Sequence, residues 1–192
     1  MLDIIKKNIS KYIKLSRDEF NYFASVVEQK RVRKKQFLLE EGEVCRFECF
    51  VNNGCLRQYH LDDNGNEHIM QFAIRDWWIS DQYSFISGLP SPYFIDALED
   101  SEVLLISKTS LDELYTKVPK FERFFRIAFQ NSYVALQRRI LANISQTAEE
   151  RYVHFSKNYP EIEQIVPQHQ VASYLGIKPE SLSRLRKLRL GR

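Results

Sequence analysis

The stretch QVASYLGIKPESLSRLRKLRLGR, residues 170–192, decides how this sequence is interpreted. Gly176 stands where a sharp turn between two helices requires a positive φ angle, which glycine adopts without steric cost. Pro179 follows where a second helix begins, since the first turn of a helix has no use for the N–H that proline lacks. We therefore predict a short helix over 168–175, a tight turn and a second helix, which is the pattern of a helix-turn-helix. The inward face of the first helix consists of Val171, Ala172 and Leu175.

The second of these helices has an apolar face and a polar face. Leucines recur every three residues, at Leu182, Leu185 and Leu188, and are predicted to be buried. The same pattern also fits a basic amphipathic helix on the surface of a helical hairpin. The opposite face carries side chains that can read base edges or hold phosphates, namely Glu180, Ser181, Arg184 and Lys187.

Charge is concentrated rather than spread over the chain. The whole sequence of 192 residues has a net charge of only +3, whereas residues 178–192 carry six basic side chains against the single acid Glu180. A hydrophobic content of 44% with 28% charged residues is typical of a folded globular protein of one or two domains. A second basic cluster comprises Lys30, Arg31, Arg33, Lys34 and Lys35.

The beginning of the chain and its cysteines indicate a cytoplasmic protein. Residues 1–16 lack the continuous apolar core of a signal peptide, and no window approaches the roughly 20 apolar residues that a membrane span needs. Cys45, Cys49 and Cys55 are then expected to be reduced thiols. Their C-x3-C-x5-C spacing matches no common zinc pattern, so no metal and no cofactor is predicted.

The middle of the chain is predicted to be an antiparallel β-sandwich or barrel. The amphipathic helix that precedes it is expected over 17–29, opened by a capping box from Ser16 to Glu19. Within residues 31–107, short apolar runs alternate with turn signals, a spacing typical of antiparallel sheets. Three of these turns contain glycines spaced 12 and 11 residues apart, Gly42, Gly54 and Gly65.

A long helix is predicted over residues 121–145, which contain neither glycine nor proline. It has two apolar stripes, so it must be covered on two sides. One side can lie on the β-unit; the other is expected to meet the same helix of a second subunit, or to be buried within a single subunit. After it, a capping box at 147–150 begins another helix, and 158–162 is expected to be a linker. The stripes are Phe121, Phe125, Phe129, Leu136 and Ile140, and Phe124, Ala128, Val134, Ala135 and Leu141.

The order of these parts resembles the CRP/FNR family of bacterial transcription regulators over nearly the whole chain. The resemblance implies an α+β fold with an N-terminal antiparallel double-stranded β-roll, a long dimerisation helix and a C-terminal helix-turn-helix. It implies a cyclic-nucleotide-binding-like effector domain over 1–117, a dimerisation helix over 118–146 and a DNA-binding domain over 147–192. The β-wing that many members place after the recognition helix is not expected in this chain.

The resemblance also assigns roles on the second helix of the motif. By the match of IKPESLSRLRK to the family, Glu180 accepts from cytosine N4, Arg184 contacts guanine through two hydrogen bonds, and Ser181 holds phosphate or base. Lys178 replaces the usual Ser or Thr helix cap and adds a phosphate contact. The predicted DNA-binding residues are Gln170, Lys178, Pro179, Glu180, Ser181, Ser183, Arg184 and Lys187.

The sensor half departs from the cyclic-nucleotide-binding members of the family. Residues 79–97 fit the frame of their binding segment, with Asp81 at the position of a Glu that holds the ribose. Ser91 and Pro92 occupy the positions of the Arg-Ser pair that neutralises the cyclic phosphate. A buried phosphate without an arginine would be costly, so the sequence disfavours cyclic AMP and leaves the effector unidentified. The candidate effector-pocket residues are Ser80, Asp81, Gln82, Ser91 and Tyr93.

Taken together, these patterns predict a homodimeric, sequence-specific regulator that binds double-stranded DNA at an inverted repeat, with no catalytic residues. RNA polymerase and a small-molecule effector are further candidate partners; a membrane is not. One alternative is a ligand-sensing module that regulates a protein partner. The other is a cupin-type metalloenzyme, for which His60, His68 and Glu67 would have to converge on one metal.

Overall fold

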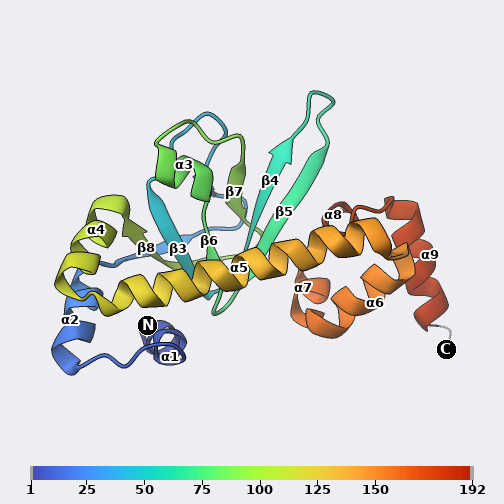
Figure 1. Ribbon diagram of the computed structural model, residues 1–192. Coiled ribbons are helices and arrows are strands. Elements are labelled where there is room, and N and C mark those ends of the chain that lie inside the picture. The colour runs from blue at the N-terminus through green and yellow to red at the C-terminus, as the bar shows by residue number, and fades with distance from the viewer. Residues whose placement is uncertain (1, 191–192) are drawn as a thin grey trace.

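A computed structural model describes the backbone of residues 2–190 and the side chains of residues 2–188. The two terminal residues of the basic C-terminal cluster, Gly191 and Arg192, lie outside this range, as does the side chain of Arg189. A β-roll lies above one long helix, and a group of short helices packs at the far end of that helix (Figure 1).

The β-roll consists of two four-stranded antiparallel sheets, which confirms the predicted fold class. The first sheet has the order β1 (Glu28–Val32), β8 (Ser101–Ser107), β3 (Phe47–Asn53), β6 (Trp78–Ile79). The second sheet has the order β2 (Phe37–Leu39), β7 (Phe94–Ala97), β4 (Cys55–Leu61), β5 (Glu67–Ile74). Strand β5 therefore lies at an edge of the second sheet.

The helices begin and end where the sequence predicted, with two corrections. The helix after Ser16 ends at Val26 rather than at residue 29, because residues 28–32 pair with β8 as strand β1. The expected linker at 158–162 contains the start of a short helix, which Pro160 opens. The helices are α1 (Asp3–Ser10), α2 (Arg17–Val26), α3 (Gln82–Ser87), α4 (Lys108–Lys117), α5 (Lys120–Ser145), α6 (Ala148–Asn158), α7 (Pro160–Ile165), α8 (Gln168–Leu175) and α9 (Pro179–Leu190).

Two apolar clusters hold the described residues together. The first fills the roll interior and extends to the helices around it, with Phe23, Phe50 and Phe121 fully buried. The three cysteines are free thiols, as expected, and they are fully buried; Cys49 and Cys55 lie on strands and Cys45 lies in a loop. The second cluster joins the outer face of the second sheet to the C-terminal helices.

The long helix α5 is buried along its first turns and exposed along its last ones. Phe121, Phe124 and Phe125 are buried in the roll cluster, whereas Ile140 and Ile144 are 50% and 79% exposed. Both predicted apolar stripes therefore begin in the core and end in solvent, because α5 runs past the end of the roll (Figure 1). Within the described part of the chain, no helix has the length and apolar character needed to cross a membrane.

Gly54 makes the corner at which the chain leaves one sheet for the other. Strands β3 and β4 flank this residue, and they belong to different sheets. Gly54 has φ +97°, and a Cβ atom built on it would lie 2.2 Å from Ser101 Oγ and 2.7 Å from Ser101 Cα. The corner therefore needs both the backbone freedom of glycine and its missing side chain.

We expect Gly54→Ala to lower the free energy of unfolding by about 2–4 kcal/mol, because backbone strain adds to a clash with backbone atoms. Gly42→Ala is the matched control, since Gly42 has φ +87° but nothing within 4 Å of a built Cβ. It should cost only about 1 kcal/mol. Urea unfolding of the two variants measures the difference, and equal losses would contradict the role of the close approach.

Candidate nucleic-acid interface

The turn between α8 and α9 has the geometry that the sequence predicted. Gly176 adopts the left-handed conformation with φ +63° and ends α8. Its N–H donates to Ser173 O at 3.0 Å, and the Ile177 N–H donates to Ala172 O at 3.0 Å, so carbonyls left free by the end of α8 are satisfied. Ala172 is fully buried, as expected at a close helix crossing.

A polar cluster between α6 and α7 lies beside this motif. The Tyr152 hydroxyl on α6 donates to Glu163 Oε1 and the Ser156 hydroxyl donates to Glu163 Oε2, both at 2.5 Å. Arg186 of α9 lies half-buried with its Nε 4.0 Å from Glu163 Oε1. Arg186 therefore faces the supporting helices rather than the exposed face of α9.

The exposed face of α9 brings together most of the predicted DNA-binding residues. Lys178, Pro179, Glu180, Arg184 and Lys187 are exposed. The two serines beside them, Ser181 and Ser183, are half-buried. The start of α9 and its first turns thus present three cations and one carboxylate to solvent, a combination suited to phosphates and base edges.

The predicted buried face of α9 is correct for two of its three leucines. Leu182 is buried and Leu185 is half-buried, but Leu188 is 63% exposed. The expectation for Leu188 was wrong because α9 extends past the helices that cover its first two turns (Figure 1).

Gln170 lies apart from the other predicted DNA-binding residues. Its side chain is buried against strand β5, and its Nε2 donates to Glu67 Oε2 at 3.4 Å. Its other amide atom, Oε1, is buried and has no hydrogen-bond partner among the described residues. In this arrangement Gln170 cannot reach a ligand bound to the exposed face of α9.

In the sensor half, two predicted pocket residues converge on a carboxylate that the sequence analysis missed. Ser80 Oγ donates to Glu48 Oε2 at 2.8 Å, and Gln82 Nε2 donates to Glu48 Oε1 at 2.7 Å. Burial raises the pKa of Glu48 to about 7, although the two hydrogen bonds oppose the shift. The only sequence signal was a single acid inside the apolar run FECFV.

The remaining predicted pocket residues have structural partners. Asp81 caps helix α3 by accepting from Tyr83 N at 3.1 Å and Ser84 N at 3.3 Å, while its second oxygen is buried without a partner among the described residues. Ser91 Oγ accepts from Tyr93 N at 3.0 Å within a separate turn. Ser80 and Gln82 therefore share the Glu48 carboxyl group, whereas Ser91 and Tyr93 are bonded to each other in a different turn.

The histidines of the roll do not assemble a metal site. His68 Nε2 lies 2.9 Å from Asp62 Oδ2, and His60 Nδ1 lies 2.9 Å from Pro92 O. The part of the chain that the structure describes contains no group of three or more His, Cys, Asp or Glu side chains placed to hold a metal ion. The convergence that a cupin-type metalloenzyme would need is therefore not found in residues 2–188.

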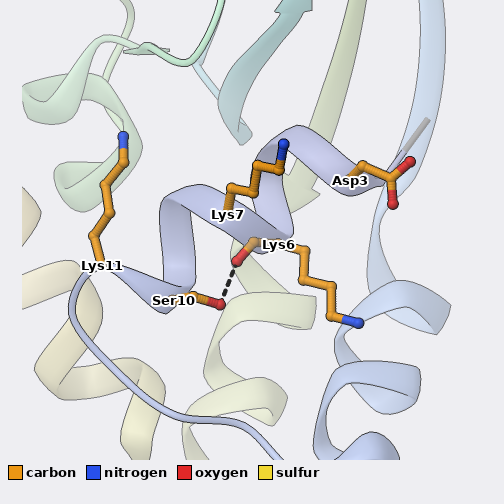
Figure 2. A pocket seen from close by; sticks show the side chains of 5 residues that line it. All are labelled: Asp3, Lys6, Lys7, Ser10 and Lys11. Atoms are coloured by element: carbon orange, nitrogen blue, oxygen red, sulfur yellow. Dashed lines mark hydrogen bonds between the residues drawn. The ribbon is translucent and has the colours of Figure 1, made fainter.

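The groove along α1 is a weak candidate for a binding site. It has a volume of about 600 Å³ and is lined by Asp3, Lys6, Lys7, Ser10 and Lys11. The close-up in Figure 2 shows the lysine side chains spreading outward from the helix rather than converging. Lys11 is already paired with Asp76 at 2.5 Å.

The fold defines a class of architecture, in which a β-roll is followed by a long helix and a helix-turn-helix. Residues 29–117 match the family model described as a cyclic nucleotide-binding domain. The fumarate and nitrate reduction regulatory protein of Vibrio cholerae is 27% identical over 183 residues, which cover 89% of this chain and 72% of that relative.

Solved structures show the same fold. FixK2 from Bradyrhizobium japonicum superposes with a TM-score of 0.71 at 20% identity, over 85% of this chain and 84% of that one. The c-di-GMP responsive global regulator CLP of Xanthomonas campestris has a TM-score of 0.73 at 13% identity, over 92% and 93% of the two chains. The chain thus contains a cyclic nucleotide-binding domain over residues 29–117, and over most of its length it is similar to transcription regulators of the CRP/FNR type.

Glu48→Gln should make stability less dependent on pH. A carboxyl whose pKa is raised by folding stabilises the folded state at pH values below its ordinary pKa of 4.5, and this stabilisation is lost as the pH rises through about 7. The wild-type protein should thus lose on the order of 2–3 kcal/mol between pH 4.5 and pH 8 from this group. The variant should be the more stable protein at pH 8.

Urea unfolding across this pH range measures the effect, with Glu113→Gln as the control because Glu113 is exposed on α4. If the free energy of unfolding changed with pH in the same way for the wild type and Glu48→Gln, the prediction would be wrong, because Glu48 would then ionise in the folded state without a cost in stability.

Proposed function

We propose that this protein is a sequence-specific DNA-binding transcription regulator that acts in the cytoplasm as a homodimer. The observation that carries the proposal is the exposed face of α9, where Lys178, Glu180, Arg184 and Lys187 surround a well-formed helix-turn-helix. An α-helix with such a face fits the major groove of DNA, where its first turns contact base edges. The proposed domains are 1–117 for the effector, 118–146 for dimerisation and 147–192 for DNA binding.

Each side chain on this face has a proposed role. Arg184 donates two hydrogen bonds to guanine O6 and N7, and Glu180 accepts from cytosine N4. Lys178 and Lys187 hold phosphates, which fixes the register without specifying sequence. Ser181 and Ser183, which are half-buried, contact phosphate or base at the edge of this face.

The exposed half of α5 supports the homodimer. Large apolar side chains recur there with spacings of four and three residues, which is the pattern of a two-stranded coiled coil. A second copy of the same helix is the simplest partner, because a two-fold axis pairs each side chain with an identical surface. The resulting dimer would carry two recognition helices and bind an inverted repeat. The seam consists of Phe129, Tyr133, Leu136, Ile140 and Ile144.

The polar interior of the roll supports an effector other than a cyclic nucleotide. Glu48, Ser80 and Gln82 form a hydrogen-bonded group around a buried carboxylate. At pH values above about 7, where Glu48 is ionised, a negatively charged phosphate beside it would be repelled, and Ser91 offers no positive charge to offset this. We therefore propose a neutral or cationic effector. We also propose RNA polymerase as a protein partner of the DNA-bound dimer.

Selection of binders from a random duplex library at about 150 mM salt tests the proposal, because non-specific phosphate binding is weakened there. We expect a two-fold symmetric motif with half-sites about one DNA turn apart. Recovery of an asymmetric motif would contradict the dimer, and recovery of no motif by the wild type or by any variant described below would contradict DNA binding.

Arg184→Ala should weaken binding to the selected site by about 1–3 kcal/mol and relax the preference at one base position. Lys178→Ala is the matched control, since the loss of a phosphate contact should weaken all sequences about equally and reduce the salt dependence. Competition binding against single-base variants of the site measures both effects. Uniform loss in Arg184→Ala would assign Arg184 to phosphate instead of guanine.

Ile140→Glu should dissociate the dimer, because it places one charge of each subunit in an apolar seam where the two face each other. The expected loss is about tenfold or more in dimer affinity. Sedimentation equilibrium of the two variants measures it, with Asn131→Glu as the control that adds the same charge outside the seam. Unchanged association of Ile140→Glu would place the dimer contact elsewhere.

A further inference from the structure

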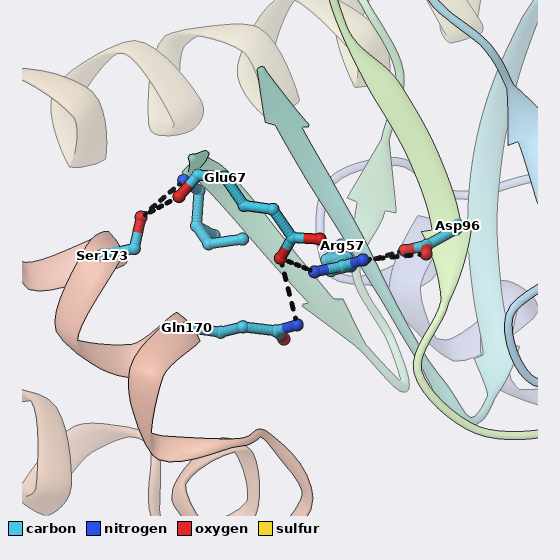
Figure 3. Close-up of polar contacts among 6 residues, drawn as sticks. Arg57, Glu67, Asp96, Gln170 and Ser173 are labelled. Carbon is cyan, nitrogen blue, oxygen red and sulfur yellow. Dashed lines mark hydrogen bonds and ion pairs between the residues drawn. The ribbon is translucent and has the colours of Figure 1, made fainter. Parts of the chain in front are cut away.

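The helix-turn-helix is docked on the β-roll rather than attached to it only through α5. Helix α8 lies along β5, and Figure 3 shows its side chains reaching the strand. Since β5 is an edge strand, its outward N–H and C=O groups need partners. Ser173 on α8 supplies two of them, because its hydroxyl donates to Glu67 O at 2.7 Å and accepts from Ile69 N at 3.0 Å.

A buried ion cluster underlies this contact. Arg57 on β4 donates to both carboxylate oxygens of Asp96 on β7, at 2.7 Å and 3.1 Å, and it also pairs with Glu67 on β5. Arg57 and Asp96 are 7% and 5% exposed. One cation faces two carboxylates, so the roll presents a net negative charge to α8, and the Gln170 amide of α8 donates to Glu67 (Figure 3).

Apolar and cationic contacts surround the polar ones. Phe72 on β5 packs on Tyr174 of α8 with ring centroids 5.4 Å apart. The guanidinium of Arg139 on α5 lies 4.9 Å from the centre of the Tyr174 ring and donates to Met70 O at 2.5 Å. Arg139 thereby links the long helix, the edge strand and the helix-turn-helix at one point.

The side-chain hydrogen-bond donors that α8 uses to contact the roll are of the kind that the first helix of a helix-turn-helix uses to contact DNA. The first helix of a helix-turn-helix crosses the DNA backbone, and Gln and Ser side chains commonly donate to phosphate oxygens there. Here the donors of Gln170 and Ser173 point to the carboxylate and carbonyl oxygens of Glu67 instead. A side chain cannot donate the same N–H or O–H to both acceptors at once.

The contact is also incompletely satisfied. Gln170 is 6% exposed, its bond to Glu67 is long at 3.4 Å, and its Oε1 has no hydrogen-bond partner among the described residues. An unpaired buried carbonyl costs free energy that opening of the contact would recover in water. The docked state is therefore held by apolar contacts and a few hydrogen bonds, and its polar part is incomplete, which suits a contact that can open.

We propose that docking of α8 on β5 is an autoinhibitory latch, in which the roll withholds Gln170 and Ser173 from DNA until the contact opens. The latch rests on the proposed DNA-binding function and adds to it a means by which the roll lowers DNA affinity. Because both partners belong to one chain, the latch acts in each subunit separately.

Ser173→Ala in the full chain tests the latch, with Ser145→Ala as the matched control. Ser145 also has a bonded hydroxyl, but its partner is Leu141 O in its own helix. Ser173→Ala should speed hydrogen exchange of the Ile69 amide. It should also tighten binding to the selected operator about 3- to 10-fold, because the shift of the population toward the open state outweighs the loss of one hydroxyl contact to phosphate. Ser145→Ala should change neither.

Arg139→Ala gives an independent reading, because it removes the bond to Met70 O and the contact with the Tyr174 ring but leaves Gln170 and Ser173 unchanged. Loss of a positive charge by itself weakens DNA binding, so a gain in affinity can come only from opening of the latch. Both variants should therefore bind more tightly than the wild type.

Two results would overturn the latch alone: faster exchange with equal or weaker DNA binding, or unchanged exchange in Ser173→Ala. If the wild type and both variants bind no DNA sequence while exchange shows the contact open, the proposed DNA-binding function fails, and the latch with it.

Discussion

The free edge of strand β5 is the constraint on which the arrangement of the C-terminal half depends. An edge strand with an apolar and charged outer face cannot be left in water without cost, and the chain covers it with its own helix-turn-helix. Ser173 takes the place of a strand partner, while Arg57 balances part of the charge of Glu67 and Asp96. This docking sets the orientation of α9 relative to α5.

The burial of helix α5 changes along its length rather than from one face to the other. Its first turns belong to the roll core through Phe121 and Phe125, and its later turns leave a seam of apolar side chains in solvent. Arg139 lies within that exposed half yet contacts both β5 and α8. Ile140 of the proposed dimer seam is the next residue along the chain from Arg139. The proposed seam and the proposed latch therefore lie side by side on α5.

The buried carboxylate of Glu48 gives the roll interior a chemical character of its own. Two hydrogen bonds from Ser80 and Gln82 hold it, yet burial still raises its pKa to about 7. We expect the protonation of this carboxyl group to change at pH values near 7, and we propose that an effector would share a hydrogen bond with it. It differs in charge from a site built for a cyclic phosphate, as the serine and proline at positions 91 and 92 suggested.

The sequence by itself determined the features that depend on neighbours within a few residues. Gly176, Pro179 and the capping boxes at Ser16 and Thr147 act through backbone groups three or four positions away, so the helix-turn-helix and the helix starts were predictable. Only the tertiary structure decided the burial of Gln170, the exposure of Leu188 and the partners of Glu48. These depend on elements far along the chain, 103 residues away for the bond between Gln170 and Glu67, and no local pattern encodes which surface will cover such a side chain.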